Sequence, residues 1–414
     1  MPTEEFLDIV CATDESGDGF ISVDDHVQEH PRVWTDRLSA KKWGDRIPRL
    51  EKDSEGFESW IIDGVKYPLC DSVTPDALMP DRARKCKSWS DIPKCVYDPK
   101  ERLKAMEIDG LSYSVLYPSV AGLAGERFER VKDPELRQAC VRAYNDWLVE
   151  EWAAMSSAFI PQCIVPVYPV SATVAEIKRS FAKGHKGVVF PALPGLLGEL
   201  AGPADAGYDA VWRTCEELEL PLCLHSGCTT EIQFPAYAGF SGLLTNAFQA
   251  ITRPLSSSFI LATALFSDIL LRHPKLKVIF ADCPVGWGMF SLETLDYMSR
   301  LEGATLKPAP SEIFKRQCYF VLCHESVDWR IGKQINPKNL LWASHFPLPT
   351  STWPNSRNRV RSNLEKLPQA DRRGILWANA DDLYKLHPQK ETNGATKVPD
   401  QLSAIRELNL DVRQ

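Results

Sequence analysis

Histidine and aspartate residues recur directly after short apolar runs of this 414-residue chain. Asp24 and His26 close the first such run, and later runs are followed by His225, Asp282 and His345. Imidazole nitrogens and carboxylate oxygens are ligands with which proteins bind Zn²⁺ or Mn²⁺ at sites that keep an open position. Imidazoles also exchange protons near neutral pH. If the runs are neighbouring strands, these side chains form one site for metal-dependent or acid–base chemistry.

Eight apolar segments, separated by polar or helical stretches, predict the strands that carry these residues. Most are continuous runs of Val, Ile, Leu and Phe, which suit strands covered on both faces, as in a parallel sheet. The segments are Phe20–Val23, Ser114–Tyr117, Phe159–Val165, Gly187–Phe190, Pro221–Leu224, Leu276–Phe280, Tyr319–Leu322 and Leu340–Ala343. Between them, Asp98-Pro99 and Asp133-Pro134 each combine an N-cap residue with a proline at the first helical position. Strand–helix alternation repeated eight times is typical of a (β/α)₈ barrel, whose active site lies at the carboxyl ends of its strands.

The sequence predicts one barrel domain over residues 1–387 and a C-terminal tail over residues 388–414. An insertion follows the first strand, over residues 34–97. It shows little periodicity, and we expect it to cap the barrel mouth. The tail mixes Lys, Asn, Gly, Pro and Gln, and we expect it to be loose or to dock on a partner subunit.

The composition excludes several classes of protein. Hydrophobic residues make up 44% of the chain and charged residues 25%, which is ordinary for a globular protein. A net charge of −7 without a dense Lys/Arg block argues against a nucleic-acid binder, and no run reaches the roughly 18 apolar residues of a membrane span. The N-terminus is acidic where a signal peptide would be basic. Twelve cysteines, several inside apolar runs and none in a CxxC pair, predict a reduced, cytoplasmic protein.

Several motifs resemble those of one family in both order and spacing. They are Val23–Glu29 with Trp34–Arg37, Arg102–Met106, Arg142–Trp147, Leu224–Gly227, His273–Lys277 with Gly286-Trp287, and Ser351–Pro354. From Phe20 to Leu386 the chain resembles the amidohydrolase-related proteins of the aminocarboxymuconate-semialdehyde decarboxylase type. The resemblance implies a distorted (β/α)₈ TIM barrel, a homodimer and a bound divalent metal, usually zinc. It also implies decarboxylation or hydrolysis of unsaturated or aromatic carboxylic acids.

The resemblance places Asp24 and His26 at the metal-ligand positions of the first strand and His225 at that of the fifth. Asp282 stands where this branch of the family usually has Glu. The eighth strand departs from the family, because the usual Ser/Thr-Asp-Tyr/Phe-Pro-His is Ser344-His345-Phe346-Pro347-Leu348 here. His345 therefore replaces the Asp that touches the metal and handles the proton, and Leu348 replaces a His.

Three consequences of this change are open at the level of sequence. In the first, Zn²⁺ or Mn²⁺ is held by Asp24, His26, His225 and His345. In the second, no metal binds and the cluster acts as a hydrolase, cyclase or isomerase. In the third, the barrel binds a small acid or a partner protein without catalysis. We favour the first, with decarboxylation of a small organic acid over hydrolysis, because the carboxylate that would deprotonate water is gone while a protonated His345 can protonate a carbanion.

His345 and Asp282 are the catalytic residues that we expect. Candidate substrate contacts are Glu29, one helical turn beyond His26, together with Trp287 and His324. Each of the three has a structural alternative. Glu29 can cap a turn, Trp287 can be a core aromatic residue, and His324 can simply begin the loop after the seventh strand.

Overall fold

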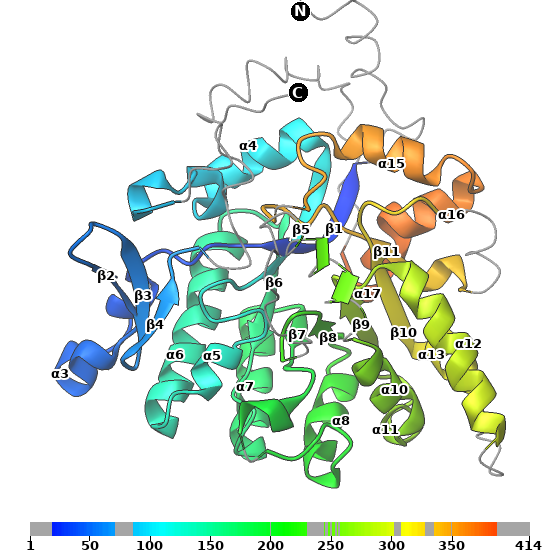
Figure 1. Cartoon of the computed structure of the whole chain (residues 1–414), viewed down its shortest axis with the longest axis horizontal. Helices are drawn as coiled ribbons and strands as arrows, with labels where there is room; N and C mark the ends of the chain where they lie inside the picture. Colours follow the sequence, from blue (N-terminus) through cyan, green and yellow to red (C-terminus); the bar gives the residue numbers. More distant parts are fainter. Residues whose placement is uncertain are drawn as a thin grey trace, which may run out of the picture.

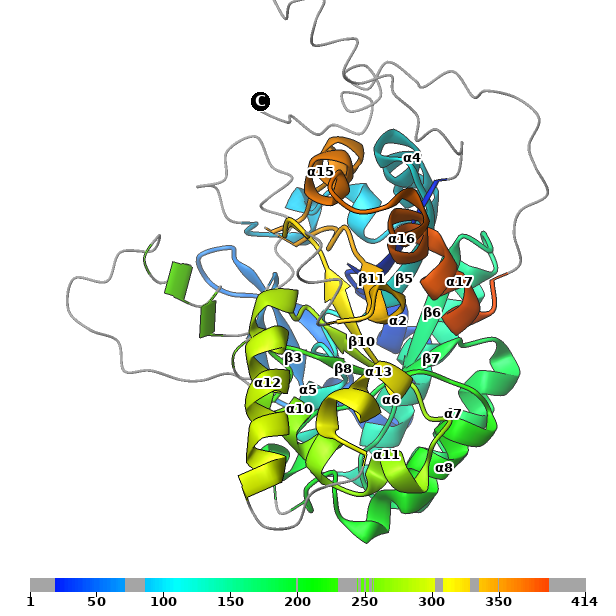
Figure 2. The same ribbon diagram turned by 90° about the vertical axis from the view of Figure 1, so that its right-hand side faces the viewer.

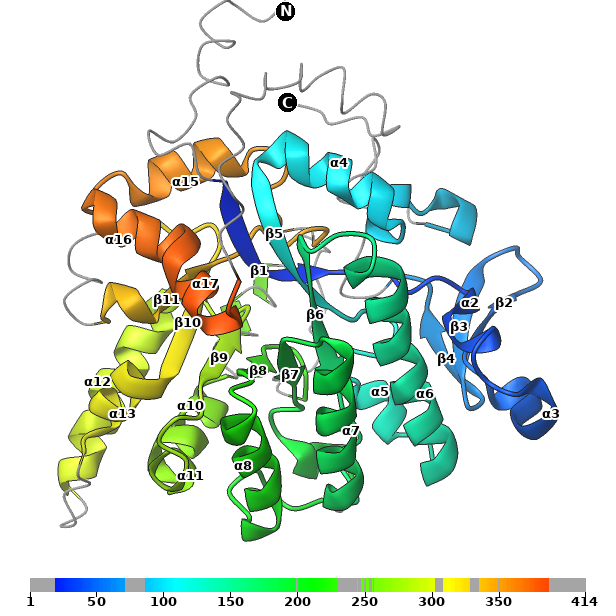
Figure 3. The ribbon, with the colours of Figure 1, turned by 180° about the vertical axis from the view of Figure 1, so that it is seen from behind.

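The computed structural model describes residues 19–70, 86–198, 200–229, 244, 247–248, 251–252, 255, 257–301, 308–327, 335–348 and 350–386. Within these ranges one sheet of parallel strands runs in the order β1-β5-β6-β7-β8-β9-β10-β11, with helices around it (Figures 1 and 3). The strands are β1 (Phe20–His26), β5 (Leu111–Tyr117), β6 (Phe159–Ile164), β7 (Gly187–Val189), β8 (Leu222–His225), β9 (Val278–Ala281), β10 (Cys318–Leu322) and β11 (Leu340–Trp342). Each predicted segment overlaps one of these strands, so the predicted (β/α)₈ barrel is confirmed.

Helices connect the strands, and two of their starts follow directly from the sequence. The side chains of Asp98 and Asp133 accept hydrogen bonds from the first free backbone N–H groups of α4 and α6, each just ahead of a proline. The helices are α2 (Arg32–Thr35), α3 (Ala40–Trp43), α4 (Pro99–Asp109), α5 (Glu126–Glu129), α6 (Pro134–Trp147), α7 (Val170–Lys183), α8 (Asp209–Glu217), α10 (Ser258–Phe266), α11 (Ile269–Arg272), α12 (Val285–Leu301), α13 (Pro310–Gln317), α15 (Ser356–Leu364), α16 (Gln369–Arg373) and α17 (Asn379–Tyr384).

One seam of the barrel is closed by loops and side chains. In the described part of the chain, β11 and β1 form no strand ladder with each other. Instead, the backbone N–H of His26 donates to the carbonyl of Phe346 at 2.7 Å. The backbone N–H of Ser344 donates to the hydroxyl of Ser22 at 2.8 Å. The seam therefore joins the carboxyl end of β1 to the loop that follows β11.

The insertion contains a small sheet that the sequence analysis did not predict. Strands β2 (Arg49–Lys52), β3 (Glu58–Ile62) and β4 (Val65–Pro68) pair antiparallel in that order, at the edge of the molecule beside α6 (Figure 1). Asp63 and Gly64 form the turn between β3 and β4, with φ of 47° and 81°. A two-residue Asp-Gly turn between apolar runs is a strong hairpin signal, and it could have revealed this sheet.

Aromatic contacts fix the insertion on the helices that follow β5. The ring of Trp34 lies 5.6 Å from that of Phe128, and its indole N–H donates to the carbonyl of Cys140. The guanidinium of Arg127 lies 4.7 Å from the ring centre of Tyr67. Because α5 follows the carboxyl end of β5, these contacts hold the insertion at the end of the barrel where an active site belongs. Its action as a cap stays a prediction.

The remaining domain predictions concern parts of the chain that are only partly described. The predicted tail, residues 388–414, lies outside the described residues, and the domain bounds stay a prediction. None of the helices in the described ranges combines the length and the hydropathy that crossing a bilayer requires.

Candidate metal centre

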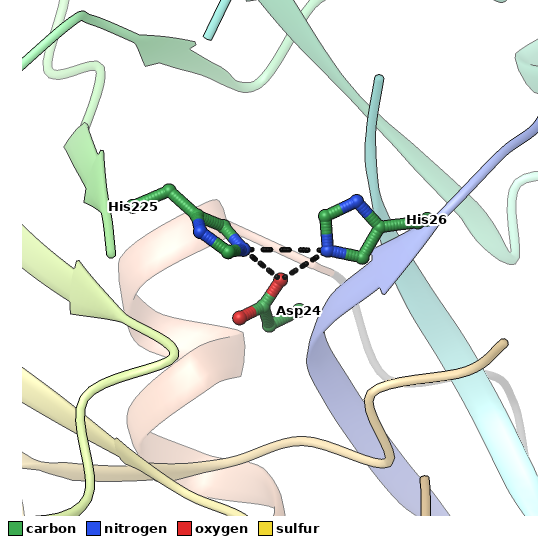
Figure 4. Close-up of side chains that lie close together, drawn as sticks. All are labelled: Asp24, His26 and His225. Atoms are coloured by element: carbon green, nitrogen blue, oxygen red, sulfur yellow. Dashed lines mark hydrogen bonds and ion pairs between the residues drawn. The ribbon is translucent and has the colours of Figure 1, made fainter. Parts of the chain in front are cut away.

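Three buried side chains meet where β1 and β8 end (Figure 4). Asp24 Oδ1 lies 3.4 Å from His26 Nε2 and 3.3 Å from His225 Nε2. The two Nε2 atoms are 3.3 Å apart, although the histidines are 199 residues apart in sequence. The parallel strand order, which brings both carboxyl ends to one barrel mouth, accounts for the meeting.

Backbone carbonyls fix both imidazole rings. His26 Nδ1 lies 3.1 Å from the carbonyl oxygen of Pro118, and His225 Nδ1 lies 2.6 Å from that of Ser226. When Nδ1–H donates to a carbonyl, the neutral ring keeps its lone pair on Nε2, which is then free to bind a metal. Both of these Nε2 atoms face Asp24 (Figure 4).

The three atoms have the spacing of ligands around one ion. Ligands bonded at about 2.1 Å in a tetrahedral arrangement stand about 3.4 Å apart, and the separations here are 3.3–3.4 Å. Neither carboxylate oxygen of Asp24 has a hydrogen-bond partner, although both are buried. Burying such oxygens unpaired is costly, and a divalent cation would satisfy them. The donor set therefore fits Zn²⁺ or Mn²⁺ with a position left open.

The carboxylate of Asp24 and the imidazoles around it each favour the charged form of the other. Burial raises the pKa of Asp24, but the surrounding imidazoles, that of His225 foremost, outweigh burial and hold this pKa well below its ordinary value. Burial lowers the pKa of His225, while the carboxylate of Asp24 more than compensates, so that the net shift is upward. The cluster therefore attracts positive charge, which either a metal ion or protons can supply.

His345 approaches the other carboxylate oxygen of Asp24. Its Nε2 lies 3.5 Å from Asp24 Oδ2 and has no hydrogen-bond partner. Its Nδ1 lies 3.7 Å from Asp282 Oδ1, an ion-pair separation, and Asp282 accepts a hydrogen bond from the hydroxyl of Ser226 at 2.7 Å. The structure thus brings together all five residues that follow the predicted strands, from β1, β8, β9 and β11.

The backbone is strained at two of these five residues. His345 has a φ of 55° and Asp282 a φ of 51°, in the left-handed region. A side chain with a Cβ rarely adopts this conformation, and such outliers gather at functional sites.

The family model described as amidohydrolase matches residues 98–386, which is most of the chain. This chain belongs to the amidohydrolase family. The match confirms the family that the sequence motifs predicted. It begins after β1, so the two ligand candidates on that strand lie outside it.

Relatives of this amidohydrolase include decarboxylases. The chain is 23% identical over 317 residues to gamma-resorcylate decarboxylase of Polaromonas sp. (strain JS666 / ATCC BAA-500), a match that covers 73% of this chain and 92% of the relative. An amidohydrolase from Mycobacterium avium subsp. paratuberculosis K-10 superposes with a TM-score of 0.70 at 20% identity, covering 89% of this chain and 99% of the other. A dihydroxybenzoic acid decarboxylase from Polaromonas sp. JS666, solved with manganese and the inhibitor 2-nitroresorcinol, has a TM-score of 0.60 at 16% identity and covers 90% and 98%. At these identities the structural likeness establishes the fold.

Glu29 of this amidohydrolase lies buried beside the loop after β5. Its carboxylate accepts hydrogen bonds from the backbone N–H groups of Ser119, Val120 and Ala121. Burial raises the pKa of Glu29 to about 7, although those N–H donors pull it the other way. The structure therefore shows Glu29 organising a loop, and its predicted contact with substrate stays a prediction.

Trp287 and His324, the other predicted substrate contacts, have contrasting surroundings. Trp287 is buried in the first turn of α12, with its ring 5.5 Å from that of Phe320 and its indole N–H without a partner. His324 is exposed and follows β10. Their roles toward substrate stay predictions.

Cys323 is a neighbour of the site that the sequence analysis missed. Its buried thiol donates to the backbone carbonyl of Thr350 at 3.8 Å. Burial raises the pKa of this thiol, but the imidazoles outweigh burial and bring it below its ordinary value. The signal in the sequence was the Cys323-His324 pair directly after the seventh apolar run.

Proposed function

We propose that this amidohydrolase is a metal-dependent decarboxylase, which removes the carboxyl group of a small aromatic acid as carbon dioxide. The proposal rests on the group of Asp24, His26 and His225, with the unpartnered Nε2 of His345 beside it. This arrangement combines a place for a divalent ion with a group that can carry a proton. The similarity to gamma-resorcylate decarboxylase supports the same class of reaction.

Asp24, His26 and His225 would hold the metal through the three atoms that face one another. Mixed nitrogen and oxygen ligands accept Zn²⁺ as well as Mn²⁺, and the manganese in the Polaromonas decarboxylase supports Mn²⁺. When bound, the ion supplies a Lewis acid that holds oxygen atoms of the substrate and neutralises their charge. A role for His345 as a fourth ligand, also expected from the sequence, stays a prediction.

His345 is the proposed proton donor. Its imidazolium gives the Nε2 proton to the ring carbon that bears the carboxylate. The bond between that carbon and the carboxylate then breaks, its electron pair restores the aromatic ring, and carbon dioxide leaves. Asp282 faces Nδ1 and balances the positive charge before transfer, which leaves Nε2 as the nitrogen turned toward Asp24. Solvent afterwards returns a proton to His345.

Purified protein is expected to contain about one equivalent of Mn²⁺ or Zn²⁺ per chain, as a single site of this type binds one ion. It should release carbon dioxide from gamma-resorcylate (2,6-dihydroxybenzoate) and turn over benzoate far more slowly, because benzoate lacks the hydroxyl groups that assist metal binding and ring protonation. Removing the metal with a chelator should abolish turnover, and adding Mn²⁺ or Zn²⁺ should restore it. Metal analysis and a carbon dioxide assay measure these results.

Two outcomes of the same experiment would overturn the proposal. Release of carbon dioxide by protein free of metal would show that the reaction does not need the ion, and the metal-dependent function would be wrong. Bound metal without turnover of any member of a hydroxybenzoate panel would favour a barrel that binds a small acid without catalysis.

We also propose that the protein works as a homodimer in the cytoplasm. The exposed fractions of Phe290 and Tyr297 on α12 are 67% and 57%, and that of Phe259 on α10 is 65%. The two helices lie beside each other on the outside of the molecule (Figure 2). Large apolar side chains gathered on adjacent helices favour coverage by a second copy. The nine buried cysteines of the described ranges are free thiols, which suits a reducing compartment.

Sedimentation at micromolar concentration is expected to give the mass of two chains. Phe290→Glu should shift the protein toward one chain, because a charge on this exposed face of α12 opposes its burial against a second copy. The same substitution at the exposed Phe181, on α7, is the matched control and should leave the mass at two chains. A wild-type protein that sediments as one chain would contradict the dimer.

A further inference from the structure

Asp25, between the two ligand candidates of β1, carries a buried carboxylate with a full set of hydrogen bonds. Its Oδ1 accepts from the hydroxyl of Ser22 at 2.8 Å, the hydroxyl of Ser344 at 2.7 Å and the backbone N–H of Phe346 at 3.1 Å. Its Oδ2 accepts from the hydroxyl of Ser114 at 2.6 Å. The carboxylate thus ties together β1, β5 and the loop after β11.

The hydrogen bonds to Asp25 Oδ1 hold both sequence neighbours of His345 in place. Ser344 precedes it and Phe346 follows it, and each donates to the same oxygen of Asp25. His345 itself has a φ of 55°, which the chain adopts only when its surroundings impose it. The two hydrogen bonds on either side are contacts of the kind that impose such a backbone.

Asp25 Oδ1 accepts these hydrogen bonds at the seam of the barrel where no strand ladder forms. Across the seam between β11 and β1, hydrogen bonds of single residues take the place of strand pairing in the described ranges. The position of His345 relative to Asp24 therefore depends on a few contacts, of which those to Asp25 are the most numerous. The buried guanidinium of Arg102, which donates to the carbonyl of His26 at 2.6 Å, places a positive charge near the Asp25 carboxylate.

We propose that Asp25 is a positioning residue, whose carboxylate holds the imidazole of His345 against Asp24 by fixing residues 344 and 346. The inference rests on the proposed function, in which His345 provides the proton. It adds that one side chain sets the position of the His345 imidazole relative to Asp24 and His26, the ligand candidates of β1. That side chain touches neither substrate nor metal.

Two serine variants separate positioning from ordinary stabilisation. Ser344→Ala removes the donor next to His345, and Ser114→Ala removes the donor to the other oxygen of the same carboxylate. Each takes one buried hydroxyl from Asp25, and Ser344→Ala also removes the oxygen that accepts from the backbone N–H of Phe346 at 3.2 Å, so its melting temperature should fall at least as far as that of Ser114→Ala. With gamma-resorcylate as the probe, only Ser344→Ala should lower kcat, by about 10–100-fold as expected for a displaced reacting group. KM and metal content should stay unchanged in both.

A second readout does not need activity. In protein labelled with ¹⁵N-histidine, the side-chain signals of His345 are identified by their absence from His345→Asn. They should shift in Ser344→Ala and stay in place in Ser114→Ala. Ser344→Cys keeps a weaker donor of similar size, so it should shift the same signals by less, and it replaces the alanine variant if that variant does not fold.

Equal losses of kcat in both serine variants, or His345 signals that stay in place in Ser344→Ala, would overturn the inference and leave Asp25 as a structural residue only. If the wild-type protein turns over no hydroxybenzoate, the proposed function fails, whereas the histidine signals still decide whether Asp25 positions His345.

Discussion

His225→Ala is expected to lose the bound metal and the decarboxylase activity together, with the fold intact. Among the residues that the structure describes, His225 supplies one of the three side chains in the close group, and its Nε2 lies 3.3 Å from both other ligand atoms. Its removal should weaken metal affinity by more than the roughly 10–100-fold that follows when only a supporting neighbour of a ligand is removed. Metal analysis after dialysis, together with circular dichroism, measures both parts of the expectation.

His185 provides a matched control for that variant. It is also a buried histidine with one ring nitrogen 3.0 Å from a backbone carbonyl, that of Asn145. It precedes β7, whereas His225 ends the parallel strand β8, so the two lie at opposite ends of the barrel. His185→Ala should lower stability and leave the metal content unchanged. If His225→Ala keeps both metal and activity, the metal-dependent function is wrong.

His345→Asn is expected to lower kcat by about 10²–10⁴-fold, the usual contribution of a positioned general acid. Burial opposes the charged form of His345, but the Cys323 thiol and the carboxylates of Asp24 and Asp282 hold its pKa well above the ordinary value. The imidazolium is therefore present at low and neutral pH and is lost as pH rises through the raised pKa. Wild-type kcat should fall on the alkaline side, and the variant should lack that fall.

The metal state supplies a further check on the same residue. A divalent ion held by Asp24 repels a proton on His345, so loading with metal should lower the pH at which the ¹⁵N side-chain signals of His345 report loss of its proton. His345→Asp differs from His345→Asn only by a charged oxygen in place of an amide nitrogen, and it should bind the metal more tightly than the Asn variant. A His345→Asn enzyme that behaves like the wild type from about pH 5 to 8, where imidazoles titrate, would remove His345 as the proton donor.

The amino-acid sequence by itself determined the barrel and the residues at its mouth. Strands that are buried on both faces need continuous apolar runs, and eight such runs each coincide with a strand. Because parallel strands end at one face, the polar residues that close the runs had to meet there. This reasoning sufficed for Asp24, His26, His225, Asp282 and His345, and the family motifs gave the same positions.

Other features could not be predicted from the pattern of apolar runs. The sheet β2-β3-β4 was missed because its strands are partly exposed and so lack the continuous apolar runs of the barrel strands. The Asp63-Gly64 turn could nevertheless have been recognised in the sequence. Cys323 was missed for another reason. A buried thiol usually packs as a small hydrophobe, and only the loop after β10 turns it toward His345.

Tertiary structure alone decided which atoms face one another. The direction of each imidazole depends on carbonyls from loops far away in sequence, such as that of Pro118 beside His26. The same holds for Glu29, whose carboxylate accepts hydrogen bonds from three N–H groups of the loop after β5. It also holds for Asp25, whose carboxylate oxygens accept hydrogen bonds from three segments of the chain. Residue types and spacing specify which groups arrive at the barrel mouth, but hydrogen bonds between loops that meet only in the folded chain set their orientation, and orientation decides which of them can hold an ion or pass a proton.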